Sequence, residues 1–339
     1  MKKFFNFAAV AAMLLTVGCA KELSYTDGDT DVVFNIEVPA LADATRDIAD
    51  GTTATQLYYA IYTEGRVLIP GLLPAAPIVL QNKETKLTFR LVKGQTYNFV
   101  FWAEPENDTY YDFNTTDATV TVNYASALAN DEKRDAFYKM VPNFKVGTSV
   151  PEDVILKRPF AQVNLGANVD DVAAAQTAGI DIQKSKVTFT DVPNKLNMWD
   201  GTTEGSVDVE FDFETIPAKS GEKLEVKSTE YHYVAMNYIL ADETPDVTDV
   251  VFTLKDVNDV EINSTKVPAA NYKRNYRTNI LGYLFTSSSE WKIVIDENPA
   301  GEFNITEDTN GGYGNNKNLE VYFFWEKIKI KCRLFLSVV

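Results

Sequence analysis

The chain has 339 residues with 32 basic and 48 acidic side chains, which gives a formal net charge of −16 at pH 7. Because nucleic acid and anionic membrane surfaces attract basic proteins, this charge excludes both as favourable partners. A single histidine excludes a metal site built from several imidazoles, and we expect no metal and no other cofactor.

Residues 1–18 have the features of a secretory signal. A basic start precedes an apolar run over residues 4–17 that is too short to span a bilayer. Gly18 and Cys19 follow, and a small residue directly before a cysteine at this point is typical of bacterial lipoproteins. We therefore expect lipidation of Cys19, by palmitate or a related acyl chain, with residues 19–30 as a tether between this membrane anchor and the folded chain. The alternative is an ordinary signal peptide with a cleavage site nearby.

Residues 31–38 form the first predicted strand. Apolar and polar side chains alternate along it, which is the pattern of a strand that buries one face. The face expected to be buried carries Val32, Phe34, Ile36 and Val38. Pro39 has no backbone N–H to donate to a neighbouring strand, so we expect the strand to end there.

Arg46 follows this strand within small and polar residues, where we expect an exposed loop. If an arginine-specific, trypsin-like protease cuts there, the first strand leaves and opens a groove with unpaired backbone groups. A strand from another molecule is then able to fill the groove. The alternative is that Arg46 is a solvated loop residue and the strand stays in place.

Short strands with turn residues between them recur along the rest of the chain. In the N-terminal half the sequence predicts strands at residues 56–62, 87–91, 97–103 and 119–124. Residues 127–140 are the most helix-like stretch of this half, and we expect a domain boundary just before residue 151. In the second half the sequence predicts a short helix at residues 170–178 and strands at 154–165, 186–192, 206–214, 232–240, 250–255 and 291–296.

The clearest alternation lies in residues 207–214. We expect four apolar side chains to point inward, those of Val207, Val209, Phe211 and Phe213, with the four acidic residues between them facing solvent. Strands of a parallel sheet would be apolar on both faces. The pattern therefore predicts an all-β protein whose antiparallel sheets pack as sandwiches.

Several stretches resemble one known family. They are the signal with Cys19 and the segments GQTYNFVFWA (94–103), RDAFY (134–138), KRPFAQVNLG (157–166) and NYRTNILG (275–282). In this order the chain resembles the fimbrillin-like family of Bacteroidales surface lipoproteins, which includes pilus subunits and relatives of unassigned function. None of these segments is catalytic.

The resemblance implies two tandem transthyretin-like, antiparallel β-sandwich domains, at residues 31–150 and 151–299. It implies a lipid-anchored protein at the surface of the outer membrane. For polymerising members it implies cleavage after an arginine that follows the first strand, and insertion of a strand from a neighbouring subunit. Arg46 stands where that arginine is expected, and Arg66 is a competing site beyond the next strand.

Residues 300–339 depart from the pattern of the family, in which the chain usually ends near residue 296. Residues 306–318 are typical of a flexible linker, and residues 319–339 are basic and strongly apolar. We expect this last segment to be a donor strand or an extra edge strand, unless it replaces the natural end of the protein.

The sequence contains no pattern typical of an active site. Gly-x-Ser-x-Gly, P-loop and Cys-x-x-Cys motifs are all missing, and His232 has the setting of an ordinary strand residue. Two carboxylates for glycoside cleavage leave no spacing signal, so a secreted hydrolase stays a third hypothesis. We expect no enzyme.

Exposed aromatic rings are the candidates for glycan binding. Trp199 lies in an expected hairpin turn, where its ring is able to stack on a sugar, and is the best of them. Trp102, Tyr110 and Tyr111 lie in or near expected loops, with core packing as the alternative.

The leading hypothesis is therefore a surface structural protein, a fimbrial or fimbria-associated subunit. Its expected partners are other fimbrial subunits or copies of itself, an arginine-specific protease, and the membrane through its lipid anchor. The second hypothesis is a monomeric surface lipoprotein that binds glycan.

Overall fold

The computed structural model describes residues 28–39, 51–106, 109–149, 153–286, 290–296 and 308–309. Strands and turns make up nearly all of them, which confirms the prediction of an all-β protein. The helical elements in these ranges are α1 (Val169–Thr177), close to the predicted helix, and short 3-10 turns at Pro70–Leu72, Glu132–Arg134 and Pro217–Ser220. None of the described helices is long and apolar enough to cross a membrane.

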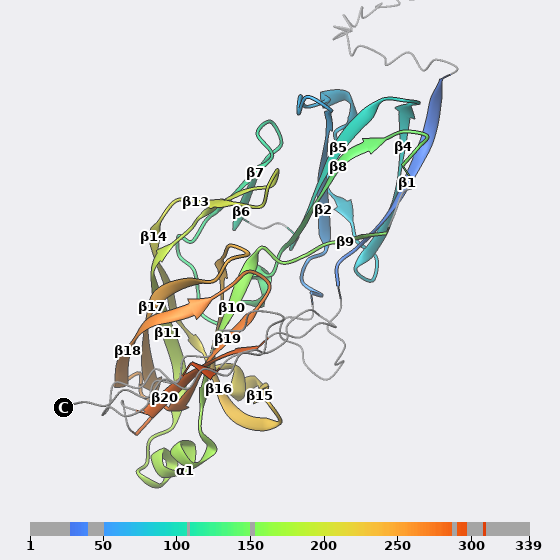
Figure 1. Ribbon diagram of the computed structural model, residues 1–339. Helices are drawn as coiled ribbons and strands as arrows, with labels where there is room; N and C mark the ends of the chain where they lie inside the picture. The colour runs from blue at the N-terminus through green and yellow to red at the C-terminus, as the bar shows by residue number, and fades with distance from the viewer. Residues whose placement is uncertain are drawn as a thin grey trace, which may run out of the picture.

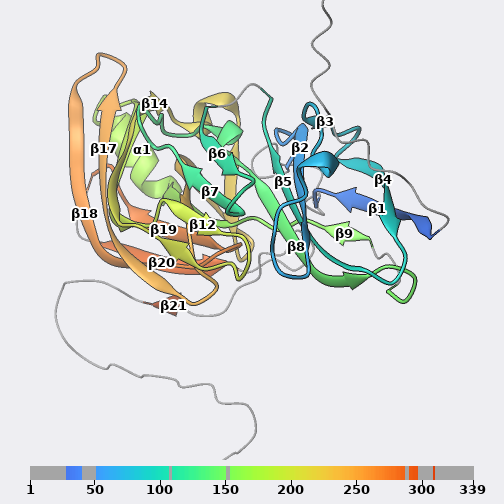
Figure 2. The ribbon, with the colours of Figure 1, turned by 90° about the horizontal axis from the view of Figure 1, so that it is seen from above.

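Two sheets build the N-terminal half, which lies at the right of Figure 2. One sheet has three strands, in the order β4 (Glu84–Val92), β1 (Asp29–Glu37) and β9 (Val154–Ile155). The other has four strands, in the order β3 (Ile78–Val79), β2 (Gln56–Thr63), β5 (Thr96–Glu104) and β8 (Phe137–Lys145). Apolar side chains from both sheets meet between them in one core.

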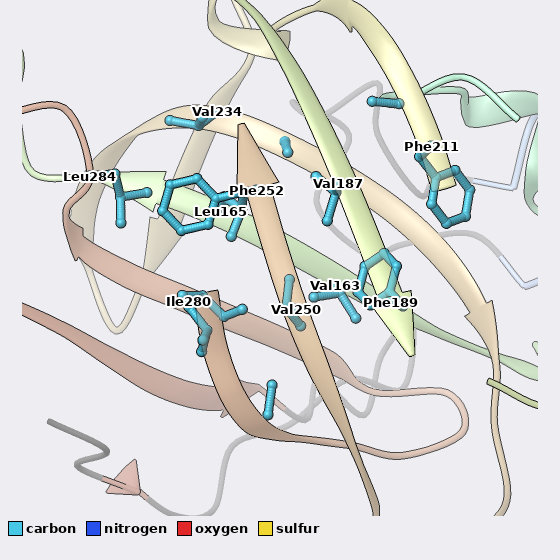
Figure 3. Packing of buried hydrophobic residues seen from close by; sticks show 14 of the residues in the cluster. Val163, Leu165, Val187, Phe189, Phe211, Val234, Val250, Phe252, Ile280 and Leu284 are labelled. Atoms are coloured by element: carbon cyan, nitrogen blue, oxygen red, sulfur yellow. The ribbon is translucent and has the colours of Figure 1, made fainter. Parts of the chain in front are cut away.

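Two larger sheets build the C-terminal half. The first has the order β14 (Val207–Thr215), β11 (Ile182–Val192), β17 (Asp246–Asp256) and β18 (Glu261–Tyr272). The second has the order β15 (Lys223–Val226), β16 (Thr229–Leu240), β10 (Phe160–Ala167), β19 (Arg277–Tyr283), β20 (Glu290–Asp296) and β21 (Asp308–Thr309). Figure 3 shows the core between these sheets, where Val163 and Ile280 face Val187, Phe189 and Phe252.

A fifth sheet joins the two halves. Its strands are β13 (Thr203–Glu204), β12 (Lys195–Asn197), β7 (Thr119–Val122) and β6 (Tyr111–Asn114). It lies between the halves in Figure 1 and covers a third core. Strand β5 is buried on both faces for this reason: Phe99 and Phe101 enter the N-terminal core, whereas Val100 and Trp102 enter the third core.

The sheets are antiparallel except at two pairs. Strand β1 runs parallel to β9, and β10 runs parallel to β19. Every residue of β10 is buried, as expected of a strand enclosed on both faces. Since β9 follows residue 151 but pairs with β1, and β12 pairs with β7, sheets are shared across the expected boundary. The division at residue 151 stays a prediction.

No α-helix forms at residues 127–140, the most helix-like stretch of the N-terminal half. A 3-10 turn at Glu132–Arg134 and the start of β8 take its place. The charged residues there favour a helix by intrinsic propensity, but Arg134 and Asp135 are buried in tertiary contacts. Propensity is a weak preference that such contacts override.

Phe213 also differs from its prediction, because it is only half-buried. The pairing of β14 with β11 shifts register between Ser185 and Val187, and this irregularity interrupts the alternation beyond Phe211. The ring of Phe213 lies beneath two ammonium groups, with Lys255 Nζ 3.9 Å and Lys186 Nζ 5.4 Å from its centroid. The Phe213 ring lies outside the core, and the alkyl stems and ammonium groups of these two lysines cover it.

Most of residues 300–339 lie outside the described residues. Within the segment expected as a linker, Asp308 and Thr309 form β21 and pair with Val294 and Ile293. The role of the apolar stretch at residues 319–339 stays a prediction.

Candidate functional site

Strand β1 has two partners of unequal length. It pairs antiparallel with β4 along all of its nine residues, from Asp29 to Glu37. On its other edge it pairs with β9 only at Ile36 and Glu37. Among the described residues, no strand pairs with that edge over residues 29–35. The backbone ladder that holds β1 is therefore mainly the one to β4.

The inward face of β1 supplies part of the N-terminal core. The four side chains on it are at most 4% exposed, and they are those of Val32, Phe34, Ile36 and Val38. The Phe34 ring lies at the centre of an aromatic cluster, with its centroid 4.8 Å from that of Phe99, 5.3 Å from Phe144, and 6.1 Å from both Phe89 and Phe101. Removing β1 would leave an apolar groove beside the unpaired edge of β4.

The outward face of β1 makes weaker contacts. Asn35 Nδ2 donates a hydrogen bond to Asp153 Oδ1 at 2.8 Å in a solvent-exposed position. Asp31 pairs with Arg90 at 3.4 Å, and both side chains are at least half exposed. Exposed ion pairs of this kind contribute little to stability. Burial of the inward face therefore holds β1 in place.

Arg46 and Cys19 both lie outside the described residues. The described chain stops at Pro39 and resumes at Gly51, and these two residues are in contact. A Cβ atom at Gly51 would lie 3.1 Å from the Pro39 carbonyl oxygen and 3.1 Å from Val38 Cγ1. Both ends of the segment that contains Arg46 are thus anchored at the end of β1.

Arg66, the competing cleavage site, lies in the connection after β2. Its side chain is exposed, and its backbone has a positive φ of 60°. The guanidinium carbon lies 4.8 Å from the centroid of the Trp199 ring. A cut at Arg66 would separate β1 and β2 together from the rest of the chain, which is a larger loss than the release of β1 alone.

A cleft of about 670 Å³ opens where the two halves meet. It is lined by the start of β8, by residues 157–158, and by the turns at 198–201 and 273–276. The half-buried Trp199 is part of the lining. Its indole N–H donates to the Asp117 carbonyl oxygen at 3.0 Å, and its ring meets Tyr62 edge to face at 4.7 Å. These contacts fix the ring at the margin of the cleft.

Arg274 connects three walls of this cleft. Its guanidinium donates to the carbonyl oxygen of Ala241 at 2.8 Å, to the hydroxyl of Tyr138 at 2.8 Å and to the carbonyl oxygen of Gly201. Gly201 has a positive φ of 78°, and a Cβ there would lie 2.8 Å from Arg274 Nη1. Glycine is thus required for this close approach.

The charge of the cleft differs from that of the chain. Among its lining residues, Arg158 is paired with Asp135, and Arg274 lies 3.8 Å from Asp242. The remaining charged lining residues are Lys139, Lys157, Lys273, Asp200 and Glu243, three ammonium groups against two carboxylates. In a protein with a net charge of −16, this cleft is a locally basic surface.

The ion pair between Asp135 and Arg158 lies beside the cleft and was not anticipated. Both side chains are 1% exposed, with Arg158 Nε 2.6 Å from Asp135 Oδ1 and Nη2 2.7 Å from Oδ2. Burial alone lowers the pKa of Arg158, but the Asp135 carboxylate outweighs it and the net shift is upward. The two residues belong to the RDAFY and KRPFAQVNLG segments. The only hint of this ion pair in the sequence was an acidic residue in one of these segments and a basic residue in the other.

The other aromatic candidates lie outside the lining of this cleft. Trp102 is fully buried, and its indole N–H donates to Glu104 Oε2 at 2.6 Å. Tyr111 is buried, and its ring packs 5.2 Å from that of Trp102. Tyr110 is half-buried beneath the Arg134 guanidinium, at 4.0 Å. Core packing accounts for Trp102 and Tyr111.

His232 lies in β16, where it is half-buried. Burial lowers its pKa, with the charge of Lys219 adding to the shift, so the ring is neutral at pH 7. Its centroid lies 5.8 Å from that of Phe285. Within the described ranges, no group of three or more His, Cys, Asp or Glu residues is placed to hold a metal ion.

Comparison with known proteins gives one family match. The sequence model of the Family of unknown function (DUF6562) matches residues 25–322. No curated protein matches the chain significantly.

Two solved structures illustrate the likeness in architecture. A fimbrial assembly protein from Parabacteroides distasonis ATCC 8503 is 13% identical, with a TM-score of 0.45 over 83% of this chain and 98% of that one. The tip fimbrial protein Mfa3 from Porphyromonas gingivalis, with C-terminal truncation, is 11% identical, with a TM-score of 0.40 over 78% of this chain and 99% of that one. At TM-scores this low, neither likeness assigns a function.

Proposed function

We propose that this chain, which belongs to the Family of unknown function (DUF6562), is an acylated cell-surface structural protein that serves as a fimbrial or fimbria-associated subunit. The observation that carries the proposal is the position of β1. Strand β1 and Val38 directly after it supply four buried side chains to the N-terminal core, yet their covalent connection to the rest of the described chain runs through the segment that contains Arg46.

Assembly then proceeds by donor-strand exchange. An arginine-specific protease cuts after Arg46, and β1 is then held only by its non-covalent contacts, so an incoming strand is able to displace it. The exposed groove contains the phenylalanine cluster around the former Phe34 position and the free edge of β4. A strand from another subunit, or from a second copy of this chain, restores both the backbone ladder and the apolar contacts. Until cleavage, β1 fills the groove and prevents aggregation.

The proposed location follows from the lipoprotein signal. Acylated Cys19 anchors the uncut protein in the outer membrane, with the folded part at the cell surface. A cut after Arg46 separates the folded part from that anchor, so strand exchange is what then holds the subunit in the fibre.

Replacing Arg46 with alanine is expected to abolish polymers. The variant should retain acylated Cys19 as its first residue, whereas the wild-type protein from the cell envelope should contain a form that begins at Asp47. Mass spectrometry of the N-terminus and electron microscopy of the cell surface measure the two effects.

The matched control is Arg66→Ala, which also removes an arginine beyond β1 but leaves the proposed cleavage site intact. This variant should still be cut and should still polymerise. Polymers formed by Arg46→Ala with Cys19 still present would rule out this exchange mechanism.

The second candidate function is a monomeric surface lipoprotein that binds glycan. The observation that favours it is the place of Trp199 in the lining of the cleft, where an aromatic ring lies beside polar side chains. Trp199→Ala is expected to remove binding on a glycan array and to leave any polymers intact. An array on which the wild-type protein binds no glycan would count against this function, whatever the result for Arg46.

A further inference from the structure

The cleft that contains Trp199 has a lining suited to a particular kind of ligand. Its volume of about 670 Å³ lies within the usual range for small-molecule sites. Apolar and aromatic groups come from Met140, Pro142, Trp199 and Tyr276. Carboxylates and ammonium groups lie among them. The lining therefore offers apolar contacts, hydrogen-bond acceptors and hydrogen-bond donors.

The ammonium groups are the less usual part of this lining. Lys139 forms no ion pair in the described part of the chain, although it is half-buried. Lys273 Nζ lies 3.0 Å from the hydroxyl oxygen of Tyr276 and 4.2 Å from the centroid of its ring. The Tyr276 hydroxyl is neutral and does not balance the charge of Lys273. Lys139 and Lys273 are thus two lining cations with no ion pair in the described part of the chain, and this favours an anionic ligand.

The carboxylates limit the kind of anion. Asp200 is held ionised, because hydrogen bonds from the Thr202 backbone N–H and hydroxyl lower its pKa. Glu243 is exposed at the margin of the cleft. These groups would repel a ligand whose polar atoms are mostly carboxylates, such as an acidic peptide. They would accept hydrogen bonds from a ligand that carries hydroxyl groups beside its acids, which the side chains of an acidic peptide do not offer.

We propose that this cleft binds an acidic oligosaccharide, with its sugar carboxylate on Lys139 and Lys273, its hydroxyl groups on Asp200 and Glu243, and a ring face on Trp199. This inference rests on the second function proposed above and names the ligand class of the same site. It is independent of cleavage at Arg46 and of strand exchange.

The rigidity of the cleft supports its use as a binding site. Arg274 ties the 198–201 turn to β8 and to the end of β16, so the walls keep their spacing without a ligand. A site that is already formed loses less entropy on binding. Lys139 and Trp199 belong to two of the lining segments held in this way.

Isothermal titration of the full mature protein with two matched probes tests the proposal. The probes are tetragalacturonate and its fully methyl-esterified form, which share ring geometry and differ in charge. The acid is expected to bind at least tenfold more tightly than the ester. Lys139→Glu should weaken binding of the acid by tenfold or more and leave the ester unaffected, since it reverses a charge that only the acid contacts.

The matched control is Lys86→Ala, at an exposed lysine of β4 outside the cleft, which should bind both probes as the wild type does. Equal affinity for acid and ester would overturn the acidic class but leave glycan binding in place. Binding of tetraglutamate as tight as that of tetragalacturonate would overturn the saccharide in favour of an acidic peptide. If neither saccharide binds, the inference is overturned. An N-terminus at Asp47 would in that case still support strand exchange.

Discussion

Replacing Phe34 with alanine is expected to lower the free energy of unfolding of the N-terminal half by about 3–5 kcal/mol. The ring is 1% exposed and lies within 6.1 Å of four other phenylalanine rings, measured between centroids. Its removal leaves a cavity lined by the four strands that carry these rings, and they cannot move together to close it because β1 is fixed in register with β4. Urea denaturation followed by tryptophan fluorescence, to which Trp102 of β5 contributes, measures the change.

Asn35→Ala is the matched control for this prediction. Asn35 is the next residue of the same strand, but its side chain is exposed and makes one hydrogen bond, to exposed Asp153. Its replacement should change the free energy of unfolding by about 0.5 kcal/mol or less. If both variants lose the same stability, β1 is held by its backbone and not by its buried face, and the basis for a specific donor strand disappears.

Phe34→Ala also connects stability to the proposed assembly. A weakened β1 should leave the groove more often before any cleavage, so a peptide of residues 29–39 added in excess should exchange into the variant faster than into the wild type. Hydrogen exchange at the β4 amides, which pair with β1, reports this opening.

Replacing Asp135 with alanine is expected to cost about 3–5 kcal/mol, because it leaves the Arg158 guanidinium buried without its carboxylate. Arg158 is 1% exposed and forms two hydrogen bonds to Asp135, with its guanidinium carbon 4.6 Å from the centroid of the Phe137 ring. The charge cannot reach water without moving β8 or residues 157–158. Thermal unfolding of the purified variant measures the loss.

The double variant Asp135→Ala with Arg158→Met separates the cost of an unpaired charge from the worth of the pair. Removing both charges should recover much of the stability lost in the single variant, since a buried pair often contributes little more than apolar residues of similar size. A double variant as unstable as Asp135→Ala alone would show that the pair is required for the geometry between the halves.

Local periodicity predicted the strands well where one face is buried and the other is wet. The alternation of Val32, Phe34, Ile36 and Val38 appears in the structure as four buried side chains, with half-buried Val33 and exposed Asn35 and Glu37 between them. The same rule placed β4 and β11 within a few residues, and runs of apolar residues also placed β5 and β16, which are buried on both faces. It failed for Phe213, because a β-bulge changes which face a residue takes and no local pattern marks the bulge.

Residues 127–140, the most helix-like stretch of the N-terminal half, show where local propensity fails to predict the structure. The charged sequence around Glu132 favours a helix, and its short 3-10 turn is capped by Asp131, whose side chain accepts from the Lys133 backbone N–H. Asp135 then leaves that turn to meet Arg158, 23 residues further along the chain. A contact over that distance is not visible in local propensity.

Sequence alone was enough for the all-β class, for the face of β1 that enters the core and for the position of Arg46 beyond it, whereas the signal with Cys19 stays a prediction. These properties depend on short-range patterns that any folded state of the chain must respect. The tertiary structure decided that β1 lies between β4 and β9, that Trp102 is enclosed while Trp199 borders a cleft, and that three lysines gather there in an acidic protein. Each of these depends on residues more than 30 positions apart, and sequence spacing does not encode which distant strands meet.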